Sequence, residues 1–277
     1  MVAFAFGQRK IVVANGSNHA EIVPYASVKI VNQPMGTYSN EYGVFEISGD
    51  LYDSILISSI GYQSSFFSKR QLLDTVFLYP IYDSLSQIII KNKLLKKKAK
   101  YGYPNAKSKF KWGPSNSSDE FAQRFTIPLQ IGEIIKVKNI FLKSKGFDPE
   151  RIVMLHIYNQ DKRTGLPDED IIYKKIIINK DNVTRNGFVL NLESENIFLQ
   201  DSVFFIGFEW LSTSSKKRGV KQTLLDMTME VSEGLTYSRS MNWPEYKWQP
   251  FHFTIPNFEA NNNFTNTIFT VDLEIYK

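Results

Sequence analysis

Residues 23–62, VPYASVKIVNQPMGTYSNEYGVFEISGDLYDSILISSIGY, decide the fold of the N-terminal part of the chain. Val28 and Ile30 alternate with polar neighbours, a turn follows at Gly36, and Gly43 precedes a second apolar run. Alternation with a period of two, bounded by turn residues, is typical of β-strands, and helical periodicity is almost absent. The stretch therefore predicts short strands of a small β-sandwich.

The order of these residues resembles the carboxypeptidase D regulatory-like domain, which is common in exported proteins of the Bacteroidetes. The resemblance covers about residues 10–79 and rests on PYASV at 24–28, GT at 36–37, NEYGVFEI at 40–47 and DSILISSIGY at 53–62. It implies a prealbumin-like seven-stranded β-sandwich, which we assign to residues 8–90. Because that family is a structural module, the resemblance implies no catalytic residue.

The composition is that of a folded, two-domain β-protein. The chain has 277 residues, which gives room for a core in each of two domains. Its 21 Phe and 14 Tyr suit β-sandwiches, because flat rings pack well on pleated sheets. Cysteine is absent, which excludes disulfides, thiolate metal sites and a cysteine nucleophile.

The formal net charge of +5 is concentrated in one segment. Residues 91–111 contain nine lysines and no acidic residue, whereas the parts on either side are slightly acidic. Such a run is typical of a solvated tether, so residues 91–118, which end in Gly, Pro, Ser and Asn, are predicted to be a linker. Since neither flanking part is basic enough to extend a contact, we expect no nucleic-acid partner.

Residues 119–277 are predicted to form a second all-β domain. Turn residues separate short apolar runs throughout, a pattern typical of a jelly-roll β-sandwich. The expected strands span 121–127, 133–142, 152–158, 171–178, 187–192, 203–210, 222–231, 236–240, 248–255 and 268–275. In outline the pattern is similar to jelly rolls of the galactose-binding type, through GEIIKV at 132–137 and MLHIY at 154–158.

The motifs that usually carry catalysis or metal binding are not found. His19, His156 and His252 are too scattered for a metal triad, and the last two lie in strand patterns that favour a structural role. The acidic loop at residues 161–170 is either a calcium site or a solvated hairpin whose interleaved basic residues would repel the ion. We therefore predict no enzyme, no cofactor and no metal, although carboxylate pairs for glycoside hydrolysis leave no signature in sequence spacing.

The most suggestive group of side chains lies in the loop WPEYKWQPF, which begins at Trp243. Sugar rings stack on exposed aromatic side chains while neighbouring polar groups bond their hydroxyls. The alternative is that the rings fold back and cap the end of the sandwich. The candidate ligand-binding residues are Trp243, Glu245, Tyr246, Trp248 and Gln249.

The N-terminal residues point to export. Residues 1–7, MVAFAFG, resemble the end of an export signal that is followed by polar residues, and the alternative is a short frayed strand. No run reaches the ~20 apolar residues of a membrane-spanning helix. We expect a location in the periplasm or at the outer-membrane surface.

These features lead to three hypotheses about function. The first is a non-catalytic cell-envelope interaction or scaffold protein, whose partner is another envelope protein. The alternative is a carbohydrate-binding protein, whose ligand is a glycan held by aromatic residues of the C-terminal jelly roll. A hydrolase with an unrecognised carboxylate site is a more distant third.

Overall fold

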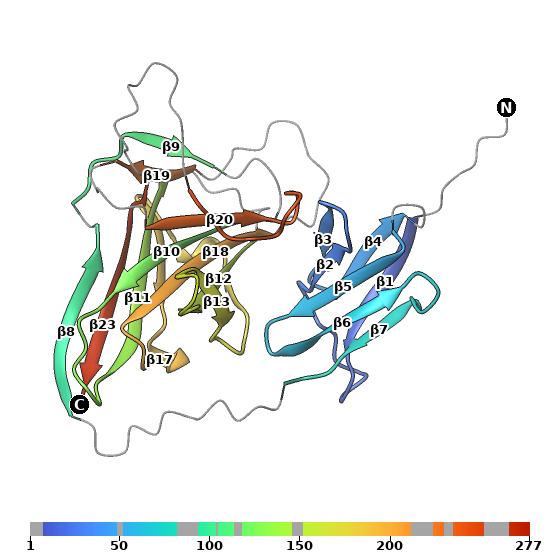
Figure 1. Cartoon of the computed structure of the whole chain (residues 1–277), viewed down its shortest axis with the longest axis horizontal. Helices are drawn as coiled ribbons and strands as arrows, with labels where there is room; N and C mark the ends of the chain where they lie inside the picture. The colour runs from blue at the N-terminus through green and yellow to red at the C-terminus, as the bar shows by residue number, and fades with distance from the viewer. Residues whose placement is uncertain are drawn as a thin grey trace.

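The computed structural model describes residues 8–48, 52–81, 94–103, 105–113, 118–145, 152–211, 224–229, 235–251 and 266–277. Within these residues the chain consists of strands and two short 3-10 helices, Lys180–Asn182 and Glu193–Glu195. The strands form two β-sandwiches that share no sheet (Figure 1). The predicted all-β fold class is thereby confirmed.

The first sandwich has seven strands in two sheets. One sheet has the order β4-β1-β7, in which β1 pairs antiparallel with β4 and parallel with β7. The other has the order β3-β2-β5-β6 and is antiparallel throughout. The strands are β1 (Gln8–Asn15), β2 (Ser27–Ile30), β3 (Gly36–Tyr38), β4 (Val44–Ser48), β5 (Ser54–Ser59), β6 (Tyr62–Ser68) and β7 (Thr75–Leu78).

The alternation in the opening stretch places one set of side chains between these sheets. Val28, Ile55 and Ile57 are fully buried and belong to one apolar cluster with Val13. The turn before β4 requires a glycine, because Gly43 has φ +71° and an added Cβ would lie 2.9 Å from the carbonyl oxygen of Val13. Local sequence and core packing thus agree in this sandwich.

The second sandwich is larger, and its two sheets face each other. The first sheet contains β10 (Asp119–Thr126), β12 (Ile152–Gln160), β13 (Pro167–Asp170), β14 (Ile176–Ile178), β18 (Val203–Leu211), β20 (Thr236–Ser240) and β21 (Gln249–Pro250). The second contains β8 (Leu95–Gly102), β9 (Phe110–Trp112), β11 (Ile134–Lys145), β15 (Val183–Thr184), β16 (Gly187–Asn191), β17 (Phe198–Leu199), β19 (Leu224–Thr228), β22 (Asn266–Thr267) and β23 (Phe269–Tyr276). The principal strands β10, β11, β12, β16, β18, β19, β20 and β23 alternate between the two sheets in chain order.

Strand β18 is buried on both of its faces. Phe204, Ile206, Phe208 and Trp210 point into the core between the two sheets. The alternate residues also have almost no exposure, and these are Phe205, Gly207, Glu209 and Leu211. A strand of a two-sheet sandwich is buried on its outer face only where something covers that face. Here the cover comes from the first sandwich and from residues 241–251.

The linker prediction for residues 91–118 is wrong for two segments that belong to the second sandwich. β8 pairs antiparallel with β23 along almost its whole length, and β9 pairs with β19. Two lysines of β8 are exposed to solvent but also pair with carboxylates of β23: Lys98 lies 3.5 Å from Glu274, and Lys100 lies 3.3 Å from Asp272. Lys96, Lys98 and Lys100 are two residues apart along β8, so they lie on the same face of the strand.

A matched pair of glycine substitutions tests this pairing. Gly102 at the end of β8 has φ +104°, and an added Cβ would lie 2.1 Å from the carbonyl oxygen of Phe269 on β23. Gly132 also has a positive φ, +82°, but nothing lies within 4 Å of its added Cβ. We expect Gly102→Ala to cost at least about 3 kcal/mol in the free energy of unfolding, and Gly132→Ala about 1–2 kcal/mol, by denaturant titration. Equal costs would contradict the pairing of β8 with β23.

Candidate functional site

The outer face of the first sheet of the second sandwich contacts the first sandwich. Tyr38 on β3 joins Met154, Leu211 and Met241 in a buried apolar cluster. The backbone approaches closely as well, because an added Cβ at Gly36 would lie 2.7 Å from the sulfur of Met241. Figure 1 shows β2 and β3 on the side of the first sandwich that faces the second.

A buried glutamate lies at the centre of this contact. One carboxylate oxygen of Glu209, Oε1, accepts a hydrogen bond of 2.5 Å from the hydroxyl of Tyr38, which belongs to the first sandwich. The other, Oε2, lies 3.1 Å from Nε2 of His156. Nδ1 of the same imidazole lies 2.6 Å from a carboxylate oxygen of Asp170. The chain of contacts thus runs from one sandwich into the other.

A second buried glutamate lies beside the first. Arg239 donates from Nε to Glu120 at 2.6 Å and from Nη2 to the hydroxyl of Tyr158 at 3.0 Å. The same Tyr158 hydroxyl donates to the other carboxylate oxygen of Glu120. The Glu120 side chain is fully buried. We call the set Tyr38, Glu120, His156, Tyr158, Asp170, Glu209 and Arg239 the interdomain network.

Strand register explains how these side chains come together. Glu120 on β10 lies directly opposite Glu209 on β18 and opposite Arg239 on β20. Gly207, which faces His156 across the β12–β18 pair, leaves the space that the network fills. An added Cβ there would lie 3.0 Å from the ring of Tyr158 and 3.1 Å from the carboxylate of Glu120. A larger residue would therefore displace the network.

The electrostatics keep the network charged. Burial alone would lower the pKa of His156, but the carboxylates of Glu120 and Asp170 outweigh it and hold that pKa well above the usual range. Burial opposes ionisation of Glu209, yet hydrogen bonds from His156 and Tyr38 keep its pKa below the usual range. Burial and the neighbouring carboxylates raise the pKa of Tyr38 and Tyr158, so both phenols remain protonated donors.

This arrangement is suited to holding elements together and poorly suited to catalysis. Two glutamates face each other, as an acid–base pair would, but both are bonded to protein groups and neither has more than 5% exposure. The carboxylates of Asp170 and Glu209 bind opposite nitrogens of His156 and so do not converge on a common point. In the part of the chain that the structure describes, no group of three His, Cys, Asp or Glu side chains is placed to hold a metal ion.

The predicted aromatic platform is not present as one exposed surface. Trp248 is only 9% exposed; its ring packs against Tyr158 with centroids 5.5 Å apart and lies 4.2 Å from the guanidinium carbon of Arg239. Tyr246 is half-buried and contacts Arg239 and Lys29 of the first sandwich, at 4.7 Å and 4.5 Å. The expectation of an exposed sugar platform is therefore wrong for Trp248, because its ring covers the buried guanidinium, as the capping alternative anticipates.

The other three candidate residues do not belong to the aromatic side chains that cover Arg239. Trp243 is half-buried, and Glu245 is exposed and pairs with Lys247 at 3.0 Å. Gln249 is exposed and lies in β21, opposite Ser238. The loop thus combines a buried ring with an exposed polar edge and does not present five side chains to one ligand.

The structure also shows how two of the histidines and the acidic loop are placed. His156 is the buried, hydrogen-bonded histidine that its strand pattern predicts, His19 is exposed, and His252 lies outside the described residues. Asp161 accepts bonds from the backbone of Arg163 at 2.7 Å and from the hydroxyl of Thr164 at 2.8 Å. Asp170, at the other end of the loop, turns to His156. These two acids therefore serve the hairpin and the network instead of a shared ion.

Comparison with known proteins gives one weak structural likeness. No family model matches the chain, and no curated protein matches it. A solved structure with some likeness contains the cysteine protease and lectin-like domains of Cwp84, a surface layer associated protein of Clostridium difficile. The two sequences are 11% identical, the TM-score is 0.40, and the match covers 97% of this chain but 58% of that chain. Among the described residues, no helix has the length and apolar character needed to cross a bilayer.

Removing one hydroxyl tests the contact between the sandwiches. Tyr38→Phe deletes the donor to Glu209 without changing the apolar packing, and a bond from a buried donor to a charged group contributes about 1.5–3 kcal/mol. We expect a loss of that size in the free energy of unfolding. Tyr42→Phe, at a tyrosine that is 66% exposed, should change it by no more than about 0.5 kcal/mol. Indistinguishable stabilities would show that the bond does not form.

The raised pKa of His156 predicts a definite pH dependence. The folded state binds the imidazole proton more tightly than the unfolded state, whose pKa is near 6.5. The stabilisation from His156 is then complete below that value and is lost as pH rises through the folded pKa. Burial lowers the pKa of Lys175 to about 8, so the contribution of Lys175 to stability rises with pH and opposes that of His156. The wild type is therefore compared with a variant that changes His156 alone. The unfolding free energy of the wild type minus that of His156→Gln should fall with rising pH, and a flat difference would contradict a charged imidazole.

Proposed function

We propose that the chain is a non-catalytic interaction or scaffold protein of the bacterial cell envelope, whose two sandwiches act as one rigid body. The observation that carries this proposal is the interdomain network. Its acidic, basic and phenolic groups bond to one another and are buried or largely buried, so they have a structural use that needs no substrate.

Rigidity follows from the buried charge at the contact. Two domains in one chain move relative to each other by default when their interface is modest and polar. Separating these sandwiches would strip the Tyr38 hydroxyl from Glu209, and removing one partner from a buried charge is strongly unfavourable. Lys175 donates a further bond from the second sandwich to the backbone of Pro24 in the first. A scaffold needs such fixed geometry between its binding surfaces.

The cellular setting is inferred from sequence features. Exported proteins of the Bacteroidetes carry the domain that residues 10–79 resemble, and residues 1–7, which lie outside the described residues, resemble the end of an export signal. Both support export to the periplasm or the outer-membrane surface, with an envelope protein as partner. Lys96, Lys98 and Lys100 of β8 are paired with carboxylates, which argues against a nucleic-acid partner.

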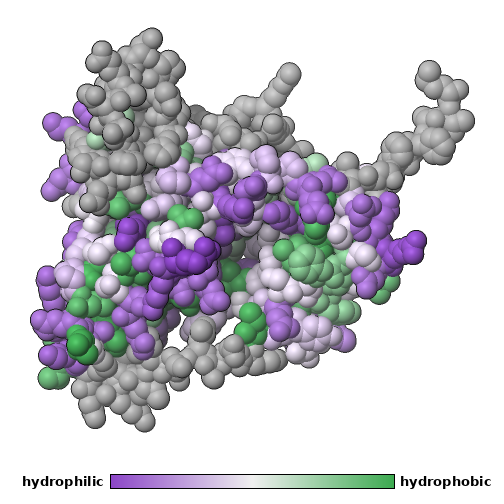
Figure 2. Space-filling view, in the orientation of Figure 1, coloured by the Kyte–Doolittle hydropathy of each residue, from purple (hydrophilic) through white to green (hydrophobic). Residues whose placement is uncertain are grey.

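The surface offers places for a protein partner. Figure 2 shows hydrophilic and apolar areas interspersed over both sandwiches on the face in view. Large apolar side chains left exposed on the first sandwich include Phe66 on β6, at 70%, and Leu73, at 64%. Carbohydrate binding remains the second candidate function, because a polar and aromatic groove lies on the other sheet of the second sandwich, away from the loop at Trp243.

Site-specific photo-crosslinking in a Bacteroidetes host tests the scaffold proposal. We would place a photoreactive phenylalanine analogue at Phe66 in the otherwise unchanged chain and in the double variant Tyr38→Ala/Met241→Ala, which weakens the interdomain contact. We expect a crosslink to one envelope protein in the periplasmic or outer-membrane fraction, and its loss in the double variant.

Two results would contradict the proposal. One is a chain confined to the cytoplasm. The other is a hydrolytic activity of the purified protein that disappears in Glu120→Gln or Glu209→Gln, since these glutamates would then be catalytic. Circular dichroism of each variant would confirm that the sandwiches remain folded.

A further inference from the structure

The outer face of the second sheet of the second sandwich carries a groove with a volume of about 400 Å³. It lies on β8, β11, β16 and β23 and is lined by Lys100, Asn139, Ile140, Phe141, Val189, Thr270 and Asp272. Small-molecule sites in proteins are clefts of roughly 300–1,000 Å³ that combine apolar walls with a few placed polar groups. The groove has that size and that mixture.

Strand register arranges the lining in two parallel rows. Val189, Phe141 and Thr270 lie directly opposite one another across β16, β11 and β23 and form a mainly apolar row. Asn139 and Asp272 form a polar row in the same way, and Lys100 on β8 extends it. The rows are two residues apart along each strand, which is roughly 7 Å.

The apolar row presents a flat ring toward solvent. Phe141 alternates with the fully buried Ile140 and with the buried Leu142, so its side chain lies on the outer face of the central strand β11. It is half-buried, and its neighbour Val189 is 39% exposed. A partly exposed aromatic ring beside an aliphatic side chain is a surface on which the C–H face of another ring can stack.

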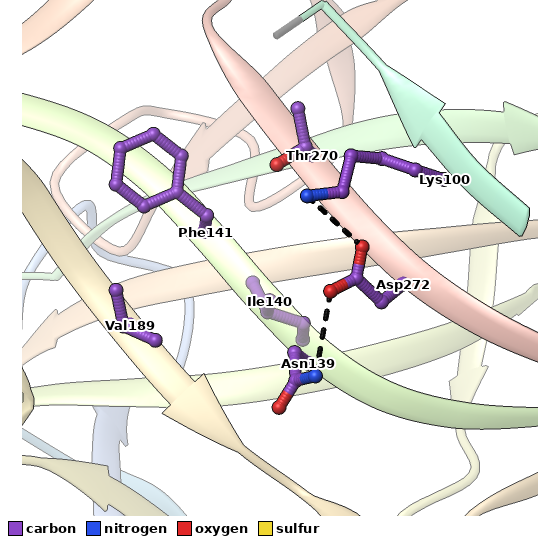
Figure 3. A pocket seen from close by; sticks show the side chains of 7 residues that line it. All are labelled: Lys100, Asn139, Ile140, Phe141, Val189, Thr270 and Asp272. Atoms are coloured by element: carbon purple, nitrogen blue, oxygen red, sulfur yellow. Dashed lines mark hydrogen bonds and ion pairs between the residues drawn. The ribbon is translucent and has the colours of Figure 1, made fainter.

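The polar row is already ordered, and it retains free hydrogen-bonding capacity. Asp272 accepts from Lys100 at 3.3 Å and from the side-chain amide of Asn139 at 3.3 Å (Figure 3). The carboxylate can accept further bonds, the ammonium has more N–H groups to donate, and the amide oxygen of Asn139 can accept. Lys100 and Asp272 balance each other's charge, so the row suits a neutral polar ligand.

We propose that this groove binds a neutral saccharide. A pyranose ring has an apolar C–H face and a rim of hydroxyls, and each hydroxyl both donates and accepts. With the C–H face on Phe141, the rim would lie over Asp272, Asn139 and Lys100, because the two rows are about one sugar ring apart. The proposal deepens the carbohydrate-binding alternative and is independent of the interdomain network, so either can fail alone.

Nuclear magnetic resonance titration of the full chain tests the site. The probes are the methyl glycosides of glucose, galactose, mannose and N-acetylglucosamine at millimolar concentration, with galacturonate and inorganic phosphate as charged comparisons. We expect at least one neutral glycoside to shift the side-chain amide of Asn139 and the backbone amides of β11 and β23.

Variants of each row must weaken that binding. Asp272→Asn removes a charged acceptor and should raise the Kd about tenfold or more. Phe141→Leu keeps an apolar side chain and the fold but removes the flat ring, and should raise the Kd about fivefold or more. Phe66→Ala, at an exposed aromatic residue of the other sandwich, should leave the Kd unchanged.

Three results would overturn the proposal. The first is that no neutral glycoside shifts the groove resonances. The second is that binding persists unchanged in both groove variants. The third is that galacturonate or phosphate binds but no neutral glycoside binds, because the groove would then be an anion site at Lys100.

Discussion

The hydrogen bond from Tyr38 to Glu209 is the contact on which the arrangement of the two sandwiches depends. An ionised carboxylate is stable away from water only when its oxygens accept hydrogen bonds. Glu209 obtains its two partners from separate parts of the chain. His156 belongs to the same sheet, and Tyr38 belongs to the other sandwich. Apolar surfaces can slide over one another, whereas a buried carboxylate has few acceptable positions. The network therefore sets the orientation of the sandwiches, and the apolar residues around it, Met154, Leu211 and Met241, exclude water.

The secondary structure was largely predictable because a period of two is visible in sequence alone. Nearly all the strands expected in the second domain are present, and the segment at 236–240 has the observed bounds of β20. The expected strand at 171–178 is shorter, since only β14 (Ile176–Ile178) pairs there and the preceding acidic residues form β13. The structure describes the expected strand at 248–255 only as far as residue 251, and within that part β21 spans the two residues Gln249–Pro250.

The interdomain network could not be predicted, because its members are far apart in sequence and meet only through sheet register. One signal was available: Glu209 lies within the apolar run VFFIGFEWL, where a lone acid implies a buried partner. The sequence left two alternatives for the aromatic loop, an exposed platform and a cap, for a related reason. Composition alone does not tell whether a tryptophan beside polar residues faces solvent or covers a charge, and Arg239, which Trp248 covers, lies on a different strand. The strand β8 was likewise missed, because the carboxylates that pair with Lys98 and Lys100 lie on β23, far away in sequence.

The pairing of β8 with β23 also governs when the second sandwich can be completed. Among the strands that the structure describes in this sandwich, β8 comes first in sequence and β23 last, and β23 also pairs with the central strand β11. A chain that emerges from the ribosome N-terminus first can close these ladders only after β23 has emerged. Contacts between distant segments slow folding, and the uncovered strand edges are open to mispairing in the meantime. Completion of the second sandwich is therefore a late step of folding, and the domain stays incomplete until β23 has paired with β8 and β11.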